Sequence, residues 1–228
     1  MDGTQLRDAR LQSAWTQHDM AVRLRVTQAY LSMVERGARP VSPELALRVA
    51  EVFDMPATAL PLGTYECGSR DELYFKSALG ALGYPGFAYL REGRRLNPAA
   101  LLMEAIDSED LDARVVEALP WLAAAFPAMD WGWLVLHAKV HDRQNRLAFV
   151  VSLARQLAES RGDFQLADKL ADILSVLEKS RLAREDTLCK ESMTTAERHW
   201  LKSHRTQLAA HWNLLSDLTL EQVDYGLL

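Results

Sequence analysis

The sequence predicts an all-α protein of two domains. Apolar residues recur at three- and four-residue spacing in one segment after another, and strand-like alternation bounded by turn residues is nowhere convincing. Several of these segments begin at a residue that caps helices, such as Thr16, Thr27 or Ser42. The stretch TYECGSRD at 64–71 is typical of a linker, which separates a domain at 1–63 from a larger one at 71–228.

Composition narrows the possible classes of protein. With 228 residues and 49 % apolar content the chain can bury a sizeable core. It has no apolar run long enough to span a membrane and no apolar signal-peptide core, so we expect a cytoplasmic protein with no membrane partner. Cys67 and Cys189 are far apart and are expected to be unpaired thiols, which argues against a disulfide framework or a zinc knuckle.

The distribution of charge separates the two domains. The net charge is −5, but residues 1–60 carry seven Lys/Arg and seven Asp/Glu, so the acidic excess lies after them. Within 23–39 there are four arginines, Arg23, Arg25, Arg36 and Arg39, against the single acid Glu35. A locally basic N-terminal domain is therefore compatible with an acidic chain and with a nucleic-acid partner.

Four helical segments are expected in order before residue 55. The first covers 6–14, and Thr16 caps a second over 17–24 with Asp19 completing a short capping box. After a turn at Arg25-Val26, Thr27 caps a third helix over 28–36, which Gly37 ends in the left-handed conformation. Ser42-Pro43-Glu44 opens the fourth. The residues expected to face inward are Met20, Ala21, Leu24, Leu31, Val34, Leu45, Val49, Ala50 and Phe53.

The second and third segments have the pattern of a helix-turn-helix. In such a unit the second helix enters the major groove with its N-terminal residues at the base edges, and the first helix points its N-terminus at the backbone. A glutamine opens each helix here. Gln17 is placed to donate to a phosphate where the helix dipole favours an anion. Gln28 is placed to contact adenine, which is worth about 1–3 kcal/mol of base discrimination.

Residues 6–55 resemble the Cro/repressor-type helix-turn-helix domain, also called the XRE family. The resemblance is carried by LRDAR, TQHDMAVRL, VTQAYLSMVERG and SPELALRVAEVF, in order and correctly spaced. It implies a lambda-repressor-like bundle of five helices, of which this stretch covers four and the start of the fifth. It also implies a structural ion pair between Arg10 and Glu35. The DNA-contacting residues that it implies are Gln17 on phosphate, Thr27, Gln28 and Ala29 on bases with contributions from Tyr30, Ser32 and Met33, and Arg36 and Arg39 on the backbone.

Two positions depart from that family. It usually has glycine where Ala14 and Arg25 stand, at helix ends that adopt a left-handed conformation. This shape costs a non-glycine residue roughly 1 kcal/mol, so we expect the fold to tolerate both.

The second domain is predicted to be helical throughout, as stacked helix hairpins. Helices are expected at 71–82, after Asn97-Pro98, from 111 to an interruption at Pro120, at 130–140, over 145–158, in FQLADKLADILSVLEKS and over 195–215. The long helices 145–158 and 195–215 are candidates for dimerisation. The tryptophans at 121, 131, 133, 200 and 212 are first expected in the core, and the cluster WLAAAFPAMDWGW is alternatively a ligand pocket or a partner-binding patch.

Signs of catalysis are weak. His137 and His141 have metal-ligand spacing but no third ligand, and the acids at 107–112 suit helix capping better than a cation site. No phosphate loop or nucleophile elbow appears. We therefore predict no enzyme, no metal and no cofactor.

These observations predict a sequence-specific DNA-binding transcriptional regulator, most simply an autorepressor, that binds a pseudo-palindromic double-stranded operator as a homodimer. Three roles stay open for the C-terminal domain. LNPAALLMEAI through DRQNRLAFVVSLARQLAE resembles the C-terminal halves of regulators associated with Abi-type nucleotidyltransferase toxins, which implies an antitoxin with a cognate toxin as partner. The alternatives are a small-molecule or peptide sensor, and an interaction scaffold that does not bind DNA.

Overall fold

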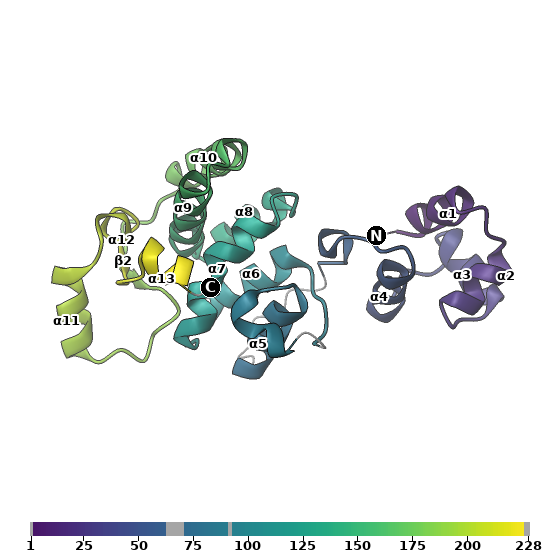
Figure 1. Cartoon of the computed structure of the whole chain (residues 1–228), viewed down its shortest axis with the longest axis horizontal. Coiled ribbons are helices and arrows are strands. Elements are labelled where there is room, and N and C mark those ends of the chain that lie inside the picture. Colours follow the sequence, from purple (N-terminus) through teal and green to yellow (C-terminus); the bar gives the residue numbers. More distant parts are fainter. Residues whose placement is uncertain (1, 63–70, 91–92, 226–228) are drawn as a thin grey trace. The chain divides into compact units, whose positions relative to one another are not determined.

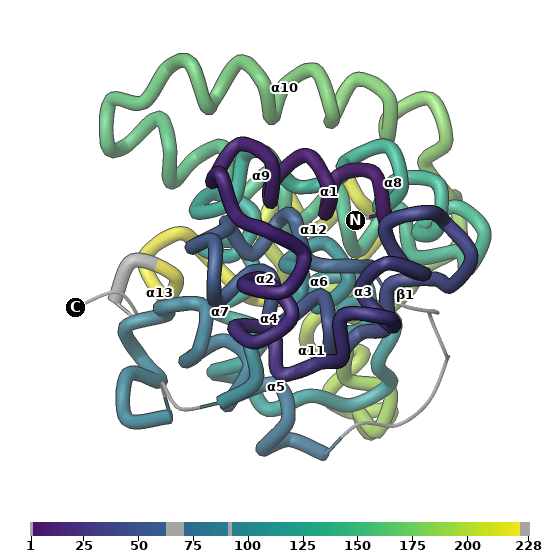
Figure 2. The backbone as a smooth tube through the Cα atoms, turned by 90° about the vertical axis from the view of Figure 1, so that its right-hand side faces the viewer, coloured from purple at the N-terminus to yellow at the C-terminus, as the bar shows by residue number. Residues whose placement is uncertain are grey.

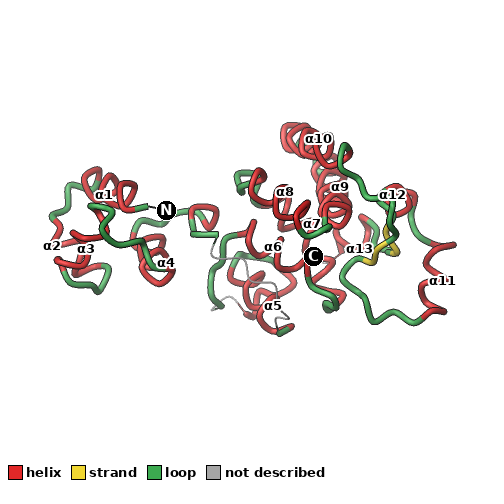
Figure 3. The backbone as a smooth tube through the Cα atoms, turned by 180° about the vertical axis from the view of Figure 1, so that it is seen from behind, coloured by secondary structure: helices red, strands yellow, loops and turns green. Residues whose placement is uncertain are grey.

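The computed structural model describes residues 2–62, 71–90 and 93–225, and the chain divides between residues 64 and 65 into two compact units. Helices dominate both units, and the strands assigned in the described residues are β1 (Asp186–Thr187) and β2 (Leu214–Leu215), which pair in parallel (Figure 3). The predicted all-α class is confirmed. Cys67 and most of the predicted linker at 64–71 lie outside the described residues.

The described residues of the N-terminal unit form four α-helices, shown in purple and blue in Figure 1. They are α1 (Gly3–Gln12), α2 (Gln17–Arg23), α3 (Gln28–Glu35) and α4 (Pro43–Val52). The helix α1 begins three residues earlier than predicted because Asp2 and Gln5 form a capping box, with Asp2 Oδ1 accepting from Gln5 N at 2.8 Å. The segment after α4 is a short 3-10 turn, Ala57–Ala59, where the family resemblance implies a fifth helix.

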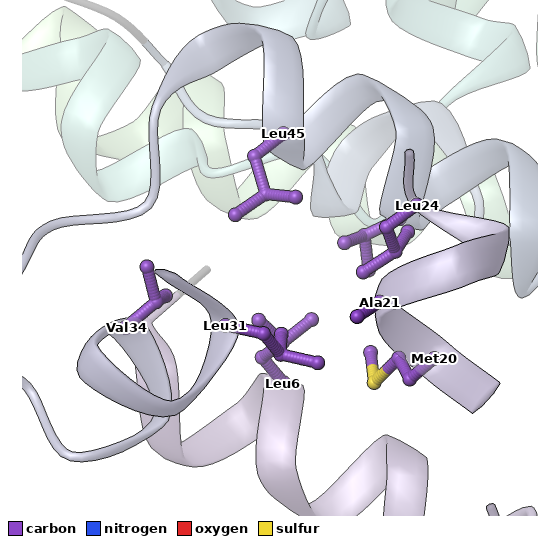
Figure 4. Close-up of a cluster of buried hydrophobic side chains, with 8 residues drawn as sticks. Leu6, Met20, Ala21, Leu24, Leu31, Val34 and Leu45 are labelled. Carbon is purple, nitrogen blue, oxygen red and sulfur yellow. The ribbon is translucent and has the colours of Figure 1, made fainter. Parts of the chain in front are cut away.

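One apolar cluster holds the four helices together. Figure 4 shows Leu6, Met20, Ala21, Leu24, Leu31, Val34 and Leu45 gathered between the helices, and each is at most 2 % exposed. Phe53 is only partly buried and lies at the edge of the cluster, where its ring centroid is 5.1 Å from that of Trp15. The three- and four-residue spacing that predicted these helices is thus the spacing of the buried side chains.

The C-terminal unit has nine α-helices in its described residues. They are α5 (Glu72–Ala81), α6 (Pro98–Asp107), α7 (Ala113–Ala125), α8 (Trp131–Val140), α9 (Gln144–Ser160), α10 (Phe164–Glu178), α11 (Thr195–His204), α12 (Gln207–His211) and α13 (Leu220–Tyr225). A 3-10 segment, Pro85–Leu90, follows α5. Figure 2 shows α10 running along one side of the unit next to α9, with which it forms a helical hairpin.

The helix α9 is the central element of this unit. All its residues from Gln144 to Ala154 are buried, because α7, α8, α10, α12 and α13 pack around it. Only the C-terminal end of α9 is open, where Arg155 and Gln156 are exposed. Dimerisation through 145–158 stays a prediction, with little exposed surface to carry it.

Two predicted helix boundaries in the C-terminal unit also differ from the structure. Pro120 does not interrupt its helix but lies inside α7, where Leu119, Pro120 and Leu122 are buried and their packing outweighs the missing backbone hydrogen bond. The expected helix 195–215 is broken into α11 and α12. The break follows from Thr206, whose side chain accepts from Ala209 N at 3.1 Å and so starts a new helix.

A buried arginine ties distant segments to α9. The side chain of Arg146 is fully buried, and its Nε and Nη2 donate to the two carboxylate oxygens of Asp186, each at 2.8 Å. Nη2 also donates to Glu191 Oε1 at 2.6 Å, and Nη1 donates to the carbonyls of Ile106 and Ser108 at 3.1 and 3.0 Å. The end of α6, the first turn of α9 and the chain around β1 are therefore joined at one guanidinium.

Candidate nucleic-acid interface

The start of α2 is fixed by a reciprocal cap. Thr16 Oγ1 accepts from Asp19 N at 3.1 Å, and Asp19 Oδ2 accepts from Thr16 N at 3.1 Å. The hydrogen bonds from the Thr16 side chain and backbone hold the pKa of the Asp19 carboxyl below its usual value. Gln17, the first residue of the helix, follows directly on this cap.

The start of α3 has a simpler cap. Thr27 Oγ1 accepts from Tyr30 N at 3.2 Å, and the residue at the third helical position is a tyrosine, which cannot complete a capping box. Gln28 is therefore the first residue of α3, and its side chain is exposed.

The turns on both sides of α2 contain a strained residue, and the turn between α2 and α3 is also braced by α4. Ala14 before α2 and Arg25 after it both have φ of 54°, in the left-handed region where glycine is usual. Arg48 of α4 donates from Nη1 to the carbonyl of Leu24 at 3.1 Å and to that of Arg25 at 3.4 Å. Sequence reasoning missed this brace. The sequence shows only that Arg48 is a cation on α4. A cation can hydrogen-bond the last carbonyls of a neighbouring helix, which is what Arg48 does at the C-terminus of α2.

The ion pair implied by the resemblance includes a third residue. Arg10 donates from Nε to Glu35 Oε1 at 2.7 Å and from Nη2 to Glu35 Oε2 at 3.0 Å, and Nη1 donates to the carbonyl of Trp15 at 3.0 Å. Gln17 Nε2 donates to the same Glu35 Oε2 at 2.8 Å. Burial opposes ionisation of Glu35, but the hydrogen bonds from Arg10 and Gln17 outweigh it and hold the pKa of the Glu35 carboxyl below its usual value.

Residues 3–62 match the model of a family described as a helix-turn-helix domain. The N-terminal unit is a helix-turn-helix domain of the Cro/repressor type. No curated protein and no solved structure matches the chain.

The residues predicted to contact DNA fall into two groups on the helix-turn-helix domain. Five are exposed, namely Thr27, Gln28, Ala29, Arg36 and Arg39, and four are partly buried, namely Gln17, Tyr30, Ser32 and Met33. Tyr30 packs against the apolar cluster, so only part of its ring is open. Arg36 folds back on its own helix, where Nε donates to the carbonyl of Ser32 at 3.1 Å.

The helix-turn-helix domain also carries exposed positive charge near α2 and α3. The side chains of Arg23, Arg25, Arg36 and Arg39 are all exposed. The guanidinium of Arg23 lies over the ring of Trp15, 4.3 Å from its centroid, an arrangement that orients the arginine without neutralising it. This charge suits a polyanionic partner, although the chain as a whole is acidic.

The side chains considered as metal ligands or catalytic groups have structural roles in the C-terminal unit. Asp112 caps α7 by accepting from Arg114 N at 3.0 Å, and Asp107 accepts from Arg143 Nε at 2.9 Å. In the part of the chain that the structure describes, no three His, Cys, Asp or Glu side chains are grouped to hold a metal ion, and no helix is long and apolar enough to cross a membrane. Burial raises the pKa of the Cys189 thiol to about 11, so it is not a thiolate at neutral pH.

Proposed function

We propose that the chain is a sequence-specific transcriptional regulator that represses its own promoter, binds a pseudo-palindromic operator and has no enzymatic activity. The supporting observation is the exposed side chain of Gln28 at the first position of α3, directly after the Thr27 cap. That position is the one a recognition helix presents to base edges in the major groove.

Gln17 is the residue that binds a DNA phosphate. Its amide nitrogen has two hydrogens, and one of them is directed at Glu35. The Arg10–Glu35 pair thereby fixes the side chain. The second amide hydrogen and the backbone N–H groups of Gln17 and His18, which precede the capped Asp19 N, are left for a phosphate. Arg36 and Arg39 supply further backbone contacts, so affinity falls steeply as salt rises.

Base recognition falls to Thr27, Gln28 and Ala29, with Ser32 and Met33 one helical turn further along α3. The amide of Gln28 suits adenine, and the methyl groups of Ala29 and Met33 suit the methyl of thymine. Tyr30 contributes through the part of its ring that the apolar cluster leaves open.

The test is binding of the full chain to the DNA upstream of its own gene, measured by fluorescence anisotropy over a range of salt concentrations. We expect Gln28→Ala to weaken operator binding by about 1–3 kcal/mol and to leave binding to unrelated DNA unchanged. We expect Arg36→Ala to weaken both and to lower the salt slope by about one. Gln12→Ala and Arg184→Ala, which change exposed residues elsewhere, are the matched controls. Unaltered operator binding by Gln28→Ala would refute the assignment of α3 as the recognition helix.

We propose that the homodimer forms through the C-terminal unit at α8 and the start of α10. Leu136 and Val140 lie one turn apart on α8 and are 58 % and 69 % exposed, and Phe164 at the start of α10 is 68 % exposed. A contiguous patch of exposed apolar side chains is typical of protein interaction surfaces.

Sedimentation velocity tests this surface. We expect Val140→Lys to shift the chain toward the monomer, because an ammonium group would have to be desolvated in the interface. Val22→Lys changes a valine that is 63 % exposed on the other unit and is the matched control. A wild-type chain that stays monomeric at concentrations that saturate the operator would rule the dimer out.

The same apolar surface suits a cognate toxin if the chain is an antitoxin. A toxin-like reading frame next to the gene, and loss of toxin capture by Val140→Lys with the dimer intact, would favour that role. The sensor alternative needs a ligand site in the C-terminal unit, and the cavity described next supplies a candidate.

A further inference from the structure

The C-terminal unit contains a cavity of about 580 Å³. The residues that line it do not include Leu136, Val140 or Phe164 of the proposed dimer interface. Its walls come from α7, α11 and α13 and from the chain around 188–193 and 215–218. Figure 1 shows α11 at the outer edge of this unit, with α7 and α13 further in. The volume lies in the range of sites that take small organic molecules, about 300–1,000 Å³.

Much of the cavity wall is apolar. Val116, Leu188, Leu201, Leu215 and Leu218 line it, and each is at most 9 % exposed. Trp200 also lines it but is 52 % exposed, and its ring is stacked on His204 with the centroids 4.4 Å apart. A ligand with an apolar body would therefore cover hydrophobic surface that water now reaches.

The charged residues of the lining are mostly acidic. Four carboxylates, those of Asp110, Glu117, Glu197 and Asp217, face one ammonium, that of Lys190. Lys190 Nζ lies 3.7 Å from Glu197 Oε1, so its charge is directed at one of the four. The remaining field is negative, which favours a cation and disfavours an anion.

Two of the acids are already used within the chain. Asp110 Oδ1 accepts from Ser192 N at 3.0 Å and from Ser192 Oγ at 2.7 Å. Glu197 Oε2 accepts from Thr194 N at 2.7 Å in the capping box of α11. Their carboxylates shape the rim of the cavity, and their hydrogen bonds leave them less available to a ligand.

Glu117 differs from these two acids. It is partly buried on α7, between the apolar residues Val116 and Ala118, and within the described residues no hydrogen bond to its carboxylate is found. Burial raises the pKa of this carboxyl, while nearby Arg114 acts in the opposite direction. A partly desolvated carboxylate without a hydrogen-bond partner gains most from a cation that brings its own hydrogen-bond donors.

We propose that this cavity binds a small organic cation, an amine with an apolar body, whose ammonium group pairs with Glu117 while the body lies against the leucines and Trp200. The site belongs to the C-terminal unit alone, so the inference does not depend on DNA binding.

Isothermal titration calorimetry of the full chain tests the proposal with three probes that share one apolar body: 4-phenylbutylamine, 4-phenylbutanol and 4-phenylbutyrate. We expect the amine to bind at one site per chain, the alcohol to bind about tenfold or more weakly, and the carboxylate not to bind. Glu117→Gln keeps the shape of the wall and removes the charge. It should lower affinity for the amine about tenfold and leave that for the alcohol unchanged. Asp168→Asn, an exposed acid on α10 outside the cavity, is the control matched in charge.

Several outcomes would overturn the proposal. One is no binding of the amine at millimolar concentration, and another is equal affinity for all three probes. A third is equal loss of amine affinity in Glu117→Gln and Asp168→Asn, which would indicate a general effect of net charge. The wild-type probe series decides the question even if Glu117→Gln fails to fold.

Discussion

Arg146→Met is expected to lower the free energy of unfolding of the C-terminal unit by about 3–5 kcal/mol, a large share of the stability of a typical domain. The methionine fills the space of the arginine stem but leaves the Asp186 carboxylate buried without its cation and the carbonyls of Ile106 and Ser108 without a donor. Burial opposes ionisation of Asp186, and the Arg146 guanidinium holds the pKa of that carboxyl below its usual value. Removing the guanidinium removes that compensation.

The control for this change lies on the same helix. Arg155 is 45 % exposed and its Nε donates to Glu159 Oε1 at 2.9 Å, in an ordinary surface pair one turn apart. Arg155→Met should alter stability by no more than about 1 kcal/mol. Urea unfolding followed by circular dichroism measures both variants. Equal losses of unfolding free energy in the two variants would mean that the buried network stabilises the unit no more than a surface ion pair does.

Glu35→Gln is expected to destabilise the helix-turn-helix domain by about 3 kcal/mol near neutral pH, because the Arg10 guanidinium then stays buried without a counter-charge. The effect should depend on pH. The folded-state pKa of Glu35 lies below its unfolded value of about 4.3, so the carboxylate contributes its full stability above that pH. This contribution is lost as the pH falls through the lowered folded pKa, and the gap between wild type and variant should close there.

Amide hydrogen exchange of α2 and α3 in the full chain, measured from pH 7 down to acid, tests this dependence for Glu35→Gln. Glu51→Gln, an exposed acid on α4, is the matched control and should track the wild type. A gap of constant size at every pH would show that the carboxylate charge is not the cause. Operator affinity should also fall in Glu35→Gln, because Gln17 loses the charged acceptor that positions its amide.

The helix caps and the inward faces of the helices were predicted correctly, because both depend on residues that are close in the sequence. Thr16, Thr27 and Ser42 cap the helices that they were expected to cap, since a cap depends on residues at most three positions away. The inward faces of α2 and α3 follow from periodicity for the same reason. The Arg10–Glu35 pair spans 25 residues and was accessible only through the family resemblance.

Long-range contacts explain what the sequence could not predict. Arg146 meets Asp186 across 40 positions, and Arg48 reaches the end of α2 across 24. Neither contact produces a periodic pattern in the sequence from which it could be predicted. Pro120 was expected to end a helix because its local cost is real, but the packing of α7 against α9 outweighs it. The cavity beside Trp200 was likewise not predictable, because its walls come from two segments far apart in the sequence, 110–117 and 188–222. The tryptophan cluster at 121–133 suggested a pocket elsewhere.

The Arg146 network also determines how far the C-terminal unit can be divided. In helical repeat proteins each hairpin contacts only its neighbours, so hairpins can be removed from one end and the rest still folds. Here a chain shortened to end after α10 would lack Asp186 and Glu191, and Arg146 in the central helix would be left as a buried charge. We therefore expect that the chain after α10 is needed for the C-terminal unit to fold, in contrast to the end hairpin of a modular array.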